Sequence, residues 1–263
     1  RDPIWLFFGL VFPGLLLLLL GLFYPGFNDP SPDLDGRTYV EVFASIVLVL
    51  GLATLALVTL PPILGTYRQF GILRRLRTTP VHPSRLLGAQ LEVHLGVAIA
   101  AALIALVVAV VVFDVPFPKG PGWFTISYIL AAASIFSLGL LVGAIAPTTN
   151  TALALGMAIY FPMLFFAGLW IPRSVMSEGL RGVSALTPMG SDVQALEDAW
   201  LGNTPDMANL AVIRLVFFGL SAAVLSTCSA VLCRSRWLAL RRVVEGVFGS
   251  SKIAVVVVAV AIR

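Results

Sequence analysis

Residues 68–85 read RQFGILRRLRTTPVHPSR, a short basic stretch that joins two long apolar segments. On a helix of 3.6 residues per turn, its four apolar residues fall within an arc of about 160°, opposite most of the arginines. These apolar residues are Phe70, Ile72, Leu73 and Leu76. Such a helix is too short and too charged to cross a bilayer, so the pattern predicts an amphipathic helix at the membrane surface. Its polar face is then available to a soluble partner.

The composition around this stretch is that of an integral membrane protein. The chain is 59% hydrophobic and 11% charged, whereas soluble domains hold about 25% charged residues. Six stretches are apolar over about 20 residues, the length that a transmembrane helix needs. We predict spans at about 5–24, 39–64, 86–113, 123–146, 151–170 and 210–232. The expected fold class is an all-α integral membrane protein with six transmembrane helices.

The distribution of charge predicts the orientation of these spans. Residues 68–85 contain arginine and no acid, and residues 234–252 are also rich in arginine and lysine. Acidic residues such as Asp29, Asp114 and Asp198 gather in the connections on the opposite side. Because basic loops remain on the cytoplasmic side, we expect both termini to be cytoplasmic.

The connection between the fifth and sixth spans has helical features of its own. We expect two short helices at 174–185 and 191–200, separated by a Thr-Pro-Met-Gly breaker at 187–190. Ser191 and Asp192 are the predicted N-terminal cap of the second. We therefore expect short re-entrant or outer helices here, in addition to the cytoplasmic amphipathic helix.

Signatures of catalysis are missing from the sequence. Neither Lys119 nor Lys252 follows a glycine-rich turn in the manner of a P-loop, so we expect no nucleotide site on this chain. Its only histidines, His82 and His94, do not have the spacing of metal ligands. We predict no catalytic residue, no metal and no nucleic-acid partner.

Glu92 is the most unusual single residue, because it is an acid within the third predicted span. Gly88 and Gly96 lie four residues to either side of it and would let a neighbouring helix approach closely. Two interpretations remain open. Glu92 is either an ionisable group that acts in transport, or a structural carboxylate near the headgroups that pairs with Arg85 or with an arginine of the tail.

Large aromatic residues are concentrated in the fifth predicted span, where Tyr160, Phe161, Phe165 and Trp170 lie close together. They are candidates for the lining of an apolar pathway. The alternative is that they anchor the helix at the membrane interface or pack against other helices.

Three motifs, taken in order, resemble those of a known family. The chain begins Arg1-Asp2-Pro3, and the basic stretch has the form Gly-x-Leu-x-x-Leu-x-x-x-Pro, ending at Pro80. The third motif follows Gly139 and reads PTTNTALALGMAIYFPMLFFAGLWIP, with a Leu-Thr-Pro break after it. Over about residues 1–236, the chain resembles the membrane permeases of type-two ABC exporters, and within them the daunorubicin-resistance-like drug and lipid exporters.

The resemblance implies which residues act in coupling and transport. The segment 66–80 would be the coupling helix received by a partner ATPase, and the second and fifth spans would face the substrate path. The implied coupling residues are Phe70, Gly71, Ile72, Leu73, Arg74, Arg75, Leu76, Thr79 and Pro80. The candidates for the substrate path are Thr54, Asn150, Tyr160, Phe161 and Phe165.

The resemblance also implies the partners. Residues 1–236 would be a half-transporter that pairs with a second permease, identical or homologous, and with two ATPase subunits that bind ATP and Mg²⁺. It would export a hydrophobic drug or a lipid-like molecule across a bacterial plasma membrane. No role is assigned to the tail, residues 237–263.

Two other classes of function stay open. In a proton-coupled secondary transporter, Glu92 would carry the proton, but the broken helices and inverted repeats typical of that class are not evident. An intramembrane enzyme would need clustered histidine, glutamate or cysteine at membrane depth, and histidine is almost absent.

Overall fold

The structure is a computed structural model that describes residues 7–34, 36–70, 83–171, 173 and 176–206. These residues are helical apart from loops and an isolated bridge between Pro30 and Thr38. In chain order the helices are η1 (Phe7–Val11), α2 (Phe12–Phe23), η2 (Pro32–Leu34), α3 (Tyr39–Ala53), η3 (Thr54–Thr59), α4 (Leu60–Gln69), α6 (Pro83–Val107), η4 (Val108–Val112), α7 (Pro121–Ile145), α8 (Thr149–Ala167), α9 (Glu178–Leu186) and α10 (Pro188–Trp200).

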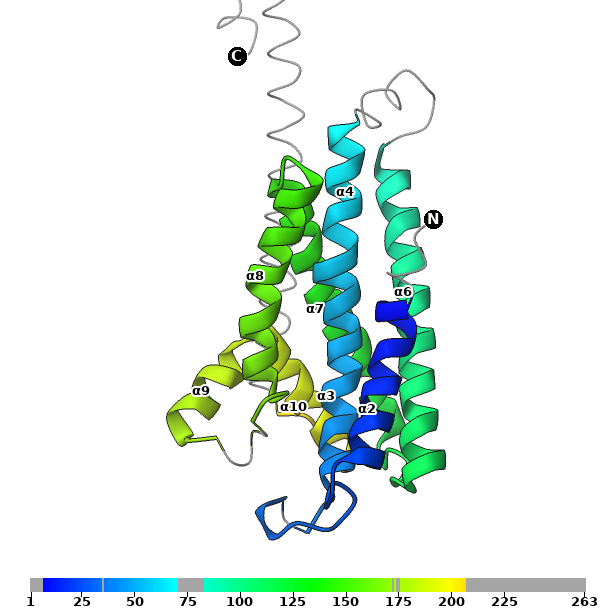
Figure 1. Cartoon of the computed structure of the whole chain (residues 1–263), viewed down its shortest axis with the longest axis vertical. Coiled ribbons are helices and arrows are strands. Elements are labelled where there is room, and N and C mark those ends of the chain that lie inside the picture. The colour runs from blue at the N-terminus through cyan, green and yellow to red at the C-terminus, as the bar shows by residue number, and fades with distance from the viewer. Residues whose placement is uncertain (1–6, 35, 71–82, 172, 174–175, 207–263) are drawn as a thin grey trace, which may run out of the picture. The chain divides into compact units, whose positions relative to one another are not determined.

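Four helical stretches are long and apolar enough to cross a membrane, which confirms the prediction of an all-α membrane protein. They are Tyr39–Gln69, Leu86–Val112, Pro121–Ile145 and Thr149–Ala167, and Phe7–Phe23 is a shorter apolar helix (Figure 1). The predicted sixth span at 210–232 and the tail lie outside the described residues. So do residues 1–6, and the coupling segment from residue 71 onward.

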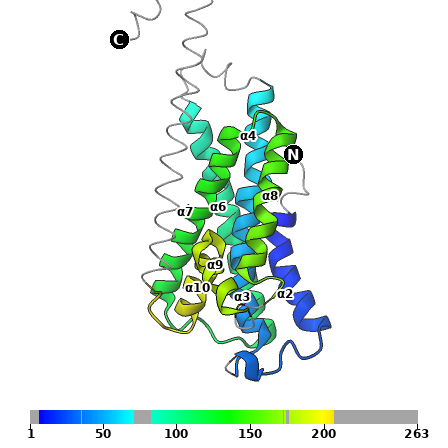
Figure 2. The same ribbon diagram turned by 90° about the vertical axis from the view of Figure 1, so that its left-hand side faces the viewer.

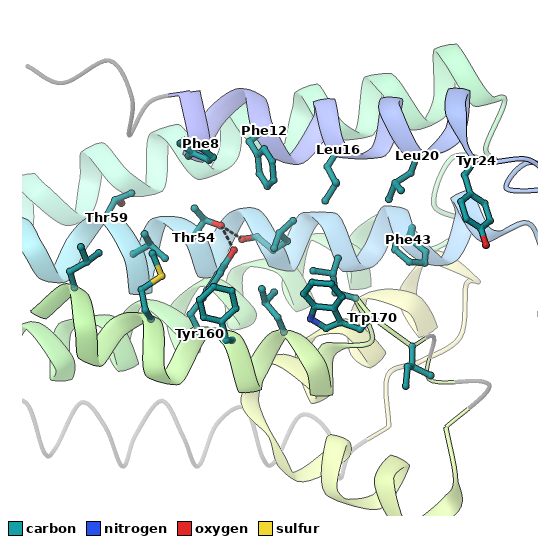
Figure 3. Close-up of a pocket in the computed structure, with 18 of the residues that line it drawn as sticks. Phe8, Phe12, Leu16, Leu20, Tyr24, Phe43, Thr54, Thr59, Tyr160 and Trp170 are labelled. Atoms are coloured by element: carbon teal, nitrogen blue, oxygen red, sulfur yellow. Dashed lines mark hydrogen bonds between the residues drawn. The ribbon is translucent and has the colours of Figure 1, made fainter.

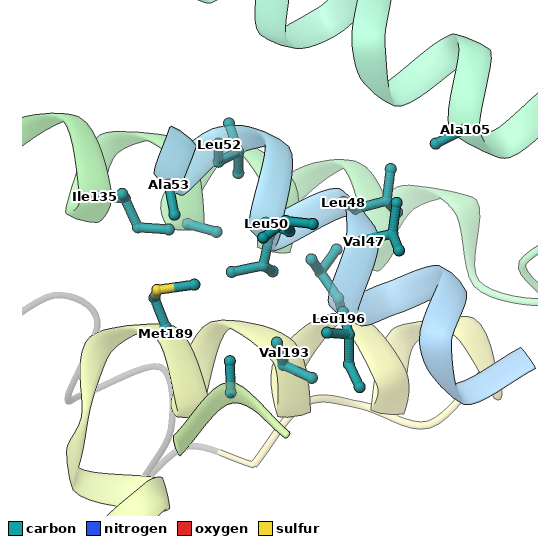
Figure 4. Close-up of a cluster of buried hydrophobic side chains, with 14 of the residues drawn as sticks. Val47, Leu48, Leu50, Leu52, Ala53, Ala105, Ile135, Met189, Val193 and Leu196 are labelled. Carbon is teal, nitrogen blue, oxygen red and sulfur yellow. The ribbon is translucent and has the colours of Figure 1, made fainter. Parts of the chain in front are cut away.

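The rod formed by α3, η3 and α4 lies at the centre of the described helices. It is contacted by α2, α6, α7, α8 and α10 (Figures 1 and 2). On one side, Leu50 and Leu52 of α3 belong to a buried cluster that also includes Ile135 of α7 and Leu196 of α10 (Figure 4). The second predicted span is therefore the core helix, and it continues as a helix to Gln69.

The π-helical turn η3 in the middle of this rod follows from two adjacent prolines. Pro61 and Pro62 have no N–H to donate to the preceding turn. The Leu60 N–H bonds to the Leu55 carbonyl, five residues back. The carbonyls of Ala56 and Leu57 therefore receive no N–H from the next turn. In a widened turn, carbonyl oxygens without a backbone N–H need other groups close by to replace the missing hydrogen bonds.

Two glycines on the neighbouring helices fill this need. Gly139 of α7 lies against the Ala56 carbonyl, and Gly156 of α8 lies against the Leu57 carbonyl. A Cβ atom at either position would collide with that carbonyl oxygen. Only glycine permits this approach, in which Cα–H groups face the free oxygens. The widened turn is thus the point where α7 and α8 pack on the central rod.

The helices between the fifth and sixth predicted spans differ from the predicted ones. The breaker at 187–190 ends α9 but also begins α10, because Thr187 Oγ1 accepts a hydrogen bond of 3.2 Å from the Gly190 N–H. The predicted cap at Ser191 is wrong, since its hydroxyl donates to the carbonyls of Thr187 and Pro188. Pro188 suits the first helical turn, where no N–H is needed.

Polar contacts hold α10 against the end of the bundle where α2 ends, which we call the α10 end. Glu197 forms an ion pair of 2.6 Å with Arg37, and Gln194 accepts a hydrogen bond of 2.8 Å from Arg173. The Trp200 indole N–H donates to the Pro116 carbonyl at 2.9 Å. These bonds join α10 to three different connections of the chain, so α10 is a fixed part of the bundle.

Asp192 of α10 is fully buried, and neither of its carboxyl oxygens has a hydrogen-bond partner among the described residues. Burial raises the pKa of this carboxyl well above its usual range, because the charged form is poorly solvated inside the protein. Asp192 therefore holds its proton more tightly inside the bundle than it would in water.

Candidate functional site

A long groove runs along one side of the central rod. The rod forms its floor, and η1 with α2 on one side and α8 on the other form its walls (Figure 3). Its volume is about 1540 Å³. Residues of the floor include Leu50, Thr54, Val58, Thr59, Pro62 and Thr66, and those of the α8 wall include Thr149, Leu153, Met157, Tyr160, Phe161 and Leu164.

The groove extends over the thickness of a membrane. Tyr24, Tyr39 and Trp170 line it at the α10 end, and Thr66 and Thr149 line it at the opposite end. The helical stretch from Tyr39 to Thr66 rises about 40 Å at 1.5 Å per residue. The hydrocarbon core of a bilayer is about 30 Å thick. A molecule in this groove would therefore have an apolar path from one membrane face to the other.

The wall formed by η1 and α2 comes from a ridge that the sequence analysis missed. Every fourth residue of this wall lines the groove, namely Phe8, Phe12, Leu16, Leu20 and Tyr24 (Figure 3). A four-residue repeat places side chains in one row along a helix. The signal was present in the sequence, but the continuous run of leucine from 15 to 20 hides it, because that run is equally apolar on every face.

The middle of the groove holds one pair of polar side chains. The Thr54 hydroxyl donates a hydrogen bond of 2.8 Å to the Leu50 carbonyl and lies 2.9 Å from the Tyr160 hydroxyl. Figure 3 shows the two side chains pointing toward each other from η3 and α8. Both residues are buried. They join the floor to the α8 wall where the rod is widened.

Two other threonine hydroxyls of the floor donate within the helix itself. Thr59 donates to the Leu55 carbonyl at 2.7 Å, and Thr66 donates to the Pro62 carbonyl at 2.9 Å. None of the described residues that line the groove carries a charge. The groove is therefore suited to an apolar molecule, because a charged one would lose its hydration without finding a counter-ion.

An aromatic cluster narrows the groove at the α10 end. The ring of Phe27 lies 5.1 Å from that of Phe43, 5.9 Å from that of Tyr24 and 6.0 Å from that of Tyr39, measured between centroids. All four rings line the groove. Edge-to-face and stacked contacts of this kind hold aromatic rings in defined positions, so this end of the groove is a firm aromatic wall.

The structure brings together three of the five predicted path residues. Thr54, Tyr160 and Phe161 line the groove, whereas Asn150 and Phe165 of α8 are not among its lining residues. Asn150 is exposed in the first turn of α8. The ring of Phe165 packs edge-to-face on that of Phe166, 5.5 Å away.

Of the predicted coupling residues, the structure describes only Phe70, which is the C-cap of α4 and is 68% exposed. Residues 66–69, the start of the predicted coupling helix, form the last turn of α4 and so belong to the rod. The other coupling residues, from Gly71 to Pro80, lie outside the described part of the chain.

Glu92 is not part of the groove. It lies on an exposed side of α6, and a Cβ atom added at Gly88 or Gly96 would meet no atom of the described residues within 4 Å. The buried polar residue of α6 is instead His94, whose Nδ1 lies 3.2 Å from the Gln90 amide nitrogen. Tyr67 of α4 donates to the Gln90 side-chain oxygen at 3.2 Å. This network joins α6 to the rod.

A comparison with known families agrees with this architecture. The family model for ABC-2 type transporters matches residues 1–198, which include all the residues that line the groove. Neither the curated proteins nor the solved structures contain a match to the chain. The chain thus belongs to the ABC-2 type transporter family, as a multi-pass transmembrane permease subunit of an ABC transporter.

Proposed function

We propose that this permease is part of an ATP-driven exporter that moves a hydrophobic, drug-like or lipid-like molecule from the cytoplasm or the inner leaflet to the outside. The observation that carries the proposal is the groove of about 1540 Å³, whose described lining residues are uncharged and mostly apolar. An apolar molecule gains free energy by moving from water into such a groove, at roughly 25 cal/mol per Å² of buried apolar surface. Movement in one direction then needs an energy source.

The energy source in this proposal is a pair of ABC ATPase subunits that bind ATP and Mg²⁺. The family supports this general kind of partner. The amphipathic stretch around Leu73 and Leu76 would contact the ATPase, and the exposed Phe70 lies where that stretch begins. A second permease, identical or homologous, would complete the complex. We place the assembly in a bacterial plasma membrane, with both termini in the cytoplasm, among the daunorubicin-resistance-like exporters.

Transport by the purified complex tests the proposal. The permease is purified from its native membranes, and a copurifying ATPase is recognised by its P-loop. Both are reconstituted in liposomes with a fluorescent phospholipid analogue as the probe. We expect movement of the probe to require ATP and Mg²⁺. Movement that a pH gradient drives without any ATPase would overturn the proposal and favour a secondary transporter.

The coupling step is tested with Leu76→Asp, because a carboxylate in an apolar contact is costly unless it is paired. We expect this variant to lose both the ATPase and transport while remaining in the membrane. The matched control is Leu186→Asp, since Leu186 is an exposed leucine, 72% accessible, at the C-terminus of α9. ATPase binding that survives Leu76→Asp would remove this stretch from the mechanism.

A further inference from the structure

We propose that the phenol oxygen of Tyr160 determines specificity in the groove by accepting a hydrogen bond from the substrate. The preferred substrate is an apolar molecule with a hydroxyl or amine N–H donor. This inference rests on the proposed function, since it concerns the same groove. It is independent of how transport is driven.

The protons of the Thr54–Tyr160 pair determine what this part of the groove offers to a substrate. Thr54 has one hydroxyl proton, which is directed to the Leu50 carbonyl at 2.8 Å. The Tyr160 oxygen is 2.9 Å from Thr54 Oγ1, so the proton between these two oxygens is that of Tyr160. In this arrangement both protons are bonded within the protein. The Tyr160 oxygen then has only lone pairs to offer.

The reverse arrangement is less favourable in the empty groove. If Thr54 donated to Tyr160, the Leu50 carbonyl would lose the Thr54 hydroxyl, and the phenol proton would need another acceptor. The residues next to Tyr160 in the groove are apolar, such as Met157, Phe161 and Leu164. A buried donor without an acceptor costs free energy. The groove is thus prepared for a substrate that donates.

Substrates with other polar groups are at a disadvantage. A molecule with only acceptors, such as an ether, either stays unpaired or takes the phenol proton, which costs one hydrogen bond of the Thr54 hydroxyl. The net value of one such bond corresponds to a factor of about three to ten in affinity. A carboxylate is excluded more strongly, because no described residue of the lining is positively charged.

The position of the pair supports a role in selection. Thr54 is in η3, near the middle of the stretch from Tyr39 to Thr66 that forms the floor. Figure 3 shows Tyr160 across the groove from Phe8 and Phe12, with the rings of Phe43, Tyr24 and Trp170 toward the α10 end. A substrate that crosses the groove from end to end must pass this oxygen.

A matched pair of probes tests the inference. We would measure binding of 4-(1-pyrenyl)butanol and of its methyl ether to the purified full-length protein. The wild type is expected to prefer the alcohol by about three- to tenfold after correction for partition into detergent. In Tyr160→Phe the ring remains but the oxygen is lost, so the preference should fall to about one while the ether binds as before.

Two further variants make the result decisive. In Thr54→Val the phenol proton loses its acceptor and can be donated to the ether oxygen. We therefore expect the ether to bind more tightly and the preference for the alcohol to fall. Tyr67→Phe removes a hydroxyl that lies outside the groove and donates to the Gln90 side chain, so it should leave the preference unchanged. If Tyr160→Phe binds neither probe, the inference is judged from the preference that Thr54→Val shows between the alcohol and the ether.

The possible failures are distinguishable. The inference would be overturned if both probes bind and neither Tyr160→Phe nor Thr54→Val alters the preference between them. The proposed function would then remain intact. Binding of neither probe by the wild type, with the groove covered by a second copy of the chain, would overturn both.

Discussion

The helical stretches Tyr39–Gln69 and Leu86–Val112 both qualify as membrane spans, yet they occupy opposite environments. The first has a mean hydropathy of 2.5 over its most apolar window, and 94% of that window is buried. The second has a mean hydropathy of 3.1, and only 22% of its window is buried. The more apolar helix is the more exposed one. Hydropathy therefore does not identify the core helix of this protein.

The physical reason lies in the surrounding solvent. Lipid tails are as apolar as leucine side chains, so an apolar helix gains little by turning toward protein. Close packing and hydrogen bonds decide which helix is central. The free carbonyls of η3 are met by Gly139 and Gly156, whereas Gly88 and Gly96 of α6 face open space. The lipid-facing surface of α6 needs no such fit.

The largest expected effect concerns the glycines that contact the central rod. Gly139→Ala or Gly156→Ala would drive a methyl group into a backbone carbonyl, and backbone moves less easily than a side chain. We expect each to lower the free energy of unfolding by about 3 kcal/mol, at the upper end of the overpacking range. Thermal or denaturant unfolding of the purified protein in detergent measures this.

The matched controls are the same substitution on the exposed helix. In Gly88→Ala and Gly96→Ala the added methyl group meets no atom within 4 Å in the part of the chain that the structure describes. Alanine also favours a helix by up to about 1 kcal/mol relative to glycine. We expect no loss and a small gain in stability. Equal losses at all four positions would show that the contrast between the two stretches is not one of packing.

The second prediction concerns Asp192 of α10, the helix that packs on α3 of the central rod. Among the helices that pack on α10, α3 carries Glu41 and α9 carries Glu178 and Arg181, whereas α7 and α8 carry no charged residue. Burial raises the pKa of Asp192, so the folded state holds its proton more tightly than the unfolded state. Stability from this group is complete below the unfolded pKa and is lost as pH rises through the folded pKa.

We therefore expect the free energy of unfolding to fall by about 2 kcal/mol as the pH rises from acid to alkaline. This is the cost of one buried polar group that ionises or stays without a partner. Asp192→Asn cannot ionise and should remove most of this dependence. Asp29→Asn, at an exposed position, should retain it. An unchanged pH profile in Asp192→Asn would mean that this carboxyl is already solvated.

The smallest effect is expected for Glu92→Gln on the exposed side of α6. Because the side chain is exposed, we expect a change of less than about 0.5 kcal/mol in stability. ATP-dependent transport should persist. Glu197→Gln, which breaks the ion pair with Arg37, is the comparison and should cost up to about 1 kcal/mol.

Loss of transport in Glu92→Gln with normal stability would assign a functional role to this carboxylate. If the wild type also transports under a pH gradient alone, this loss would favour a secondary transporter over an exporter. Efflux from proteoliposomes, measured with ATP and with an imposed gradient, separates these outcomes.

Part of the site was accessible from the sequence. Tyr160 and Phe161 were singled out because aromatic residues gather in their span, and Thr54 because the resemblance directs the second span to the path. The opposite wall was not predicted, because Phe8 and Phe12 lead into a run of leucine that is equally apolar on every face of the helix. Asn150 and Phe165 share a helix with Tyr160, but the rotation of α8 places them off the groove.

The sequence by itself determined that the chain is an all-α membrane protein of the ABC-2 type, because long apolar stretches can satisfy their backbone groups in lipid only as helices. The widened turn before Pro61 and Pro62 was not predicted from the sequence, although neither residue can donate an N–H to the preceding turn. Only the tertiary structure decided which helix is central and where the groove lies. The reason is that lipid and protein are equally apolar, so the choice depends on which carbonyl meets which glycine, and on which hydroxyl meets Tyr160.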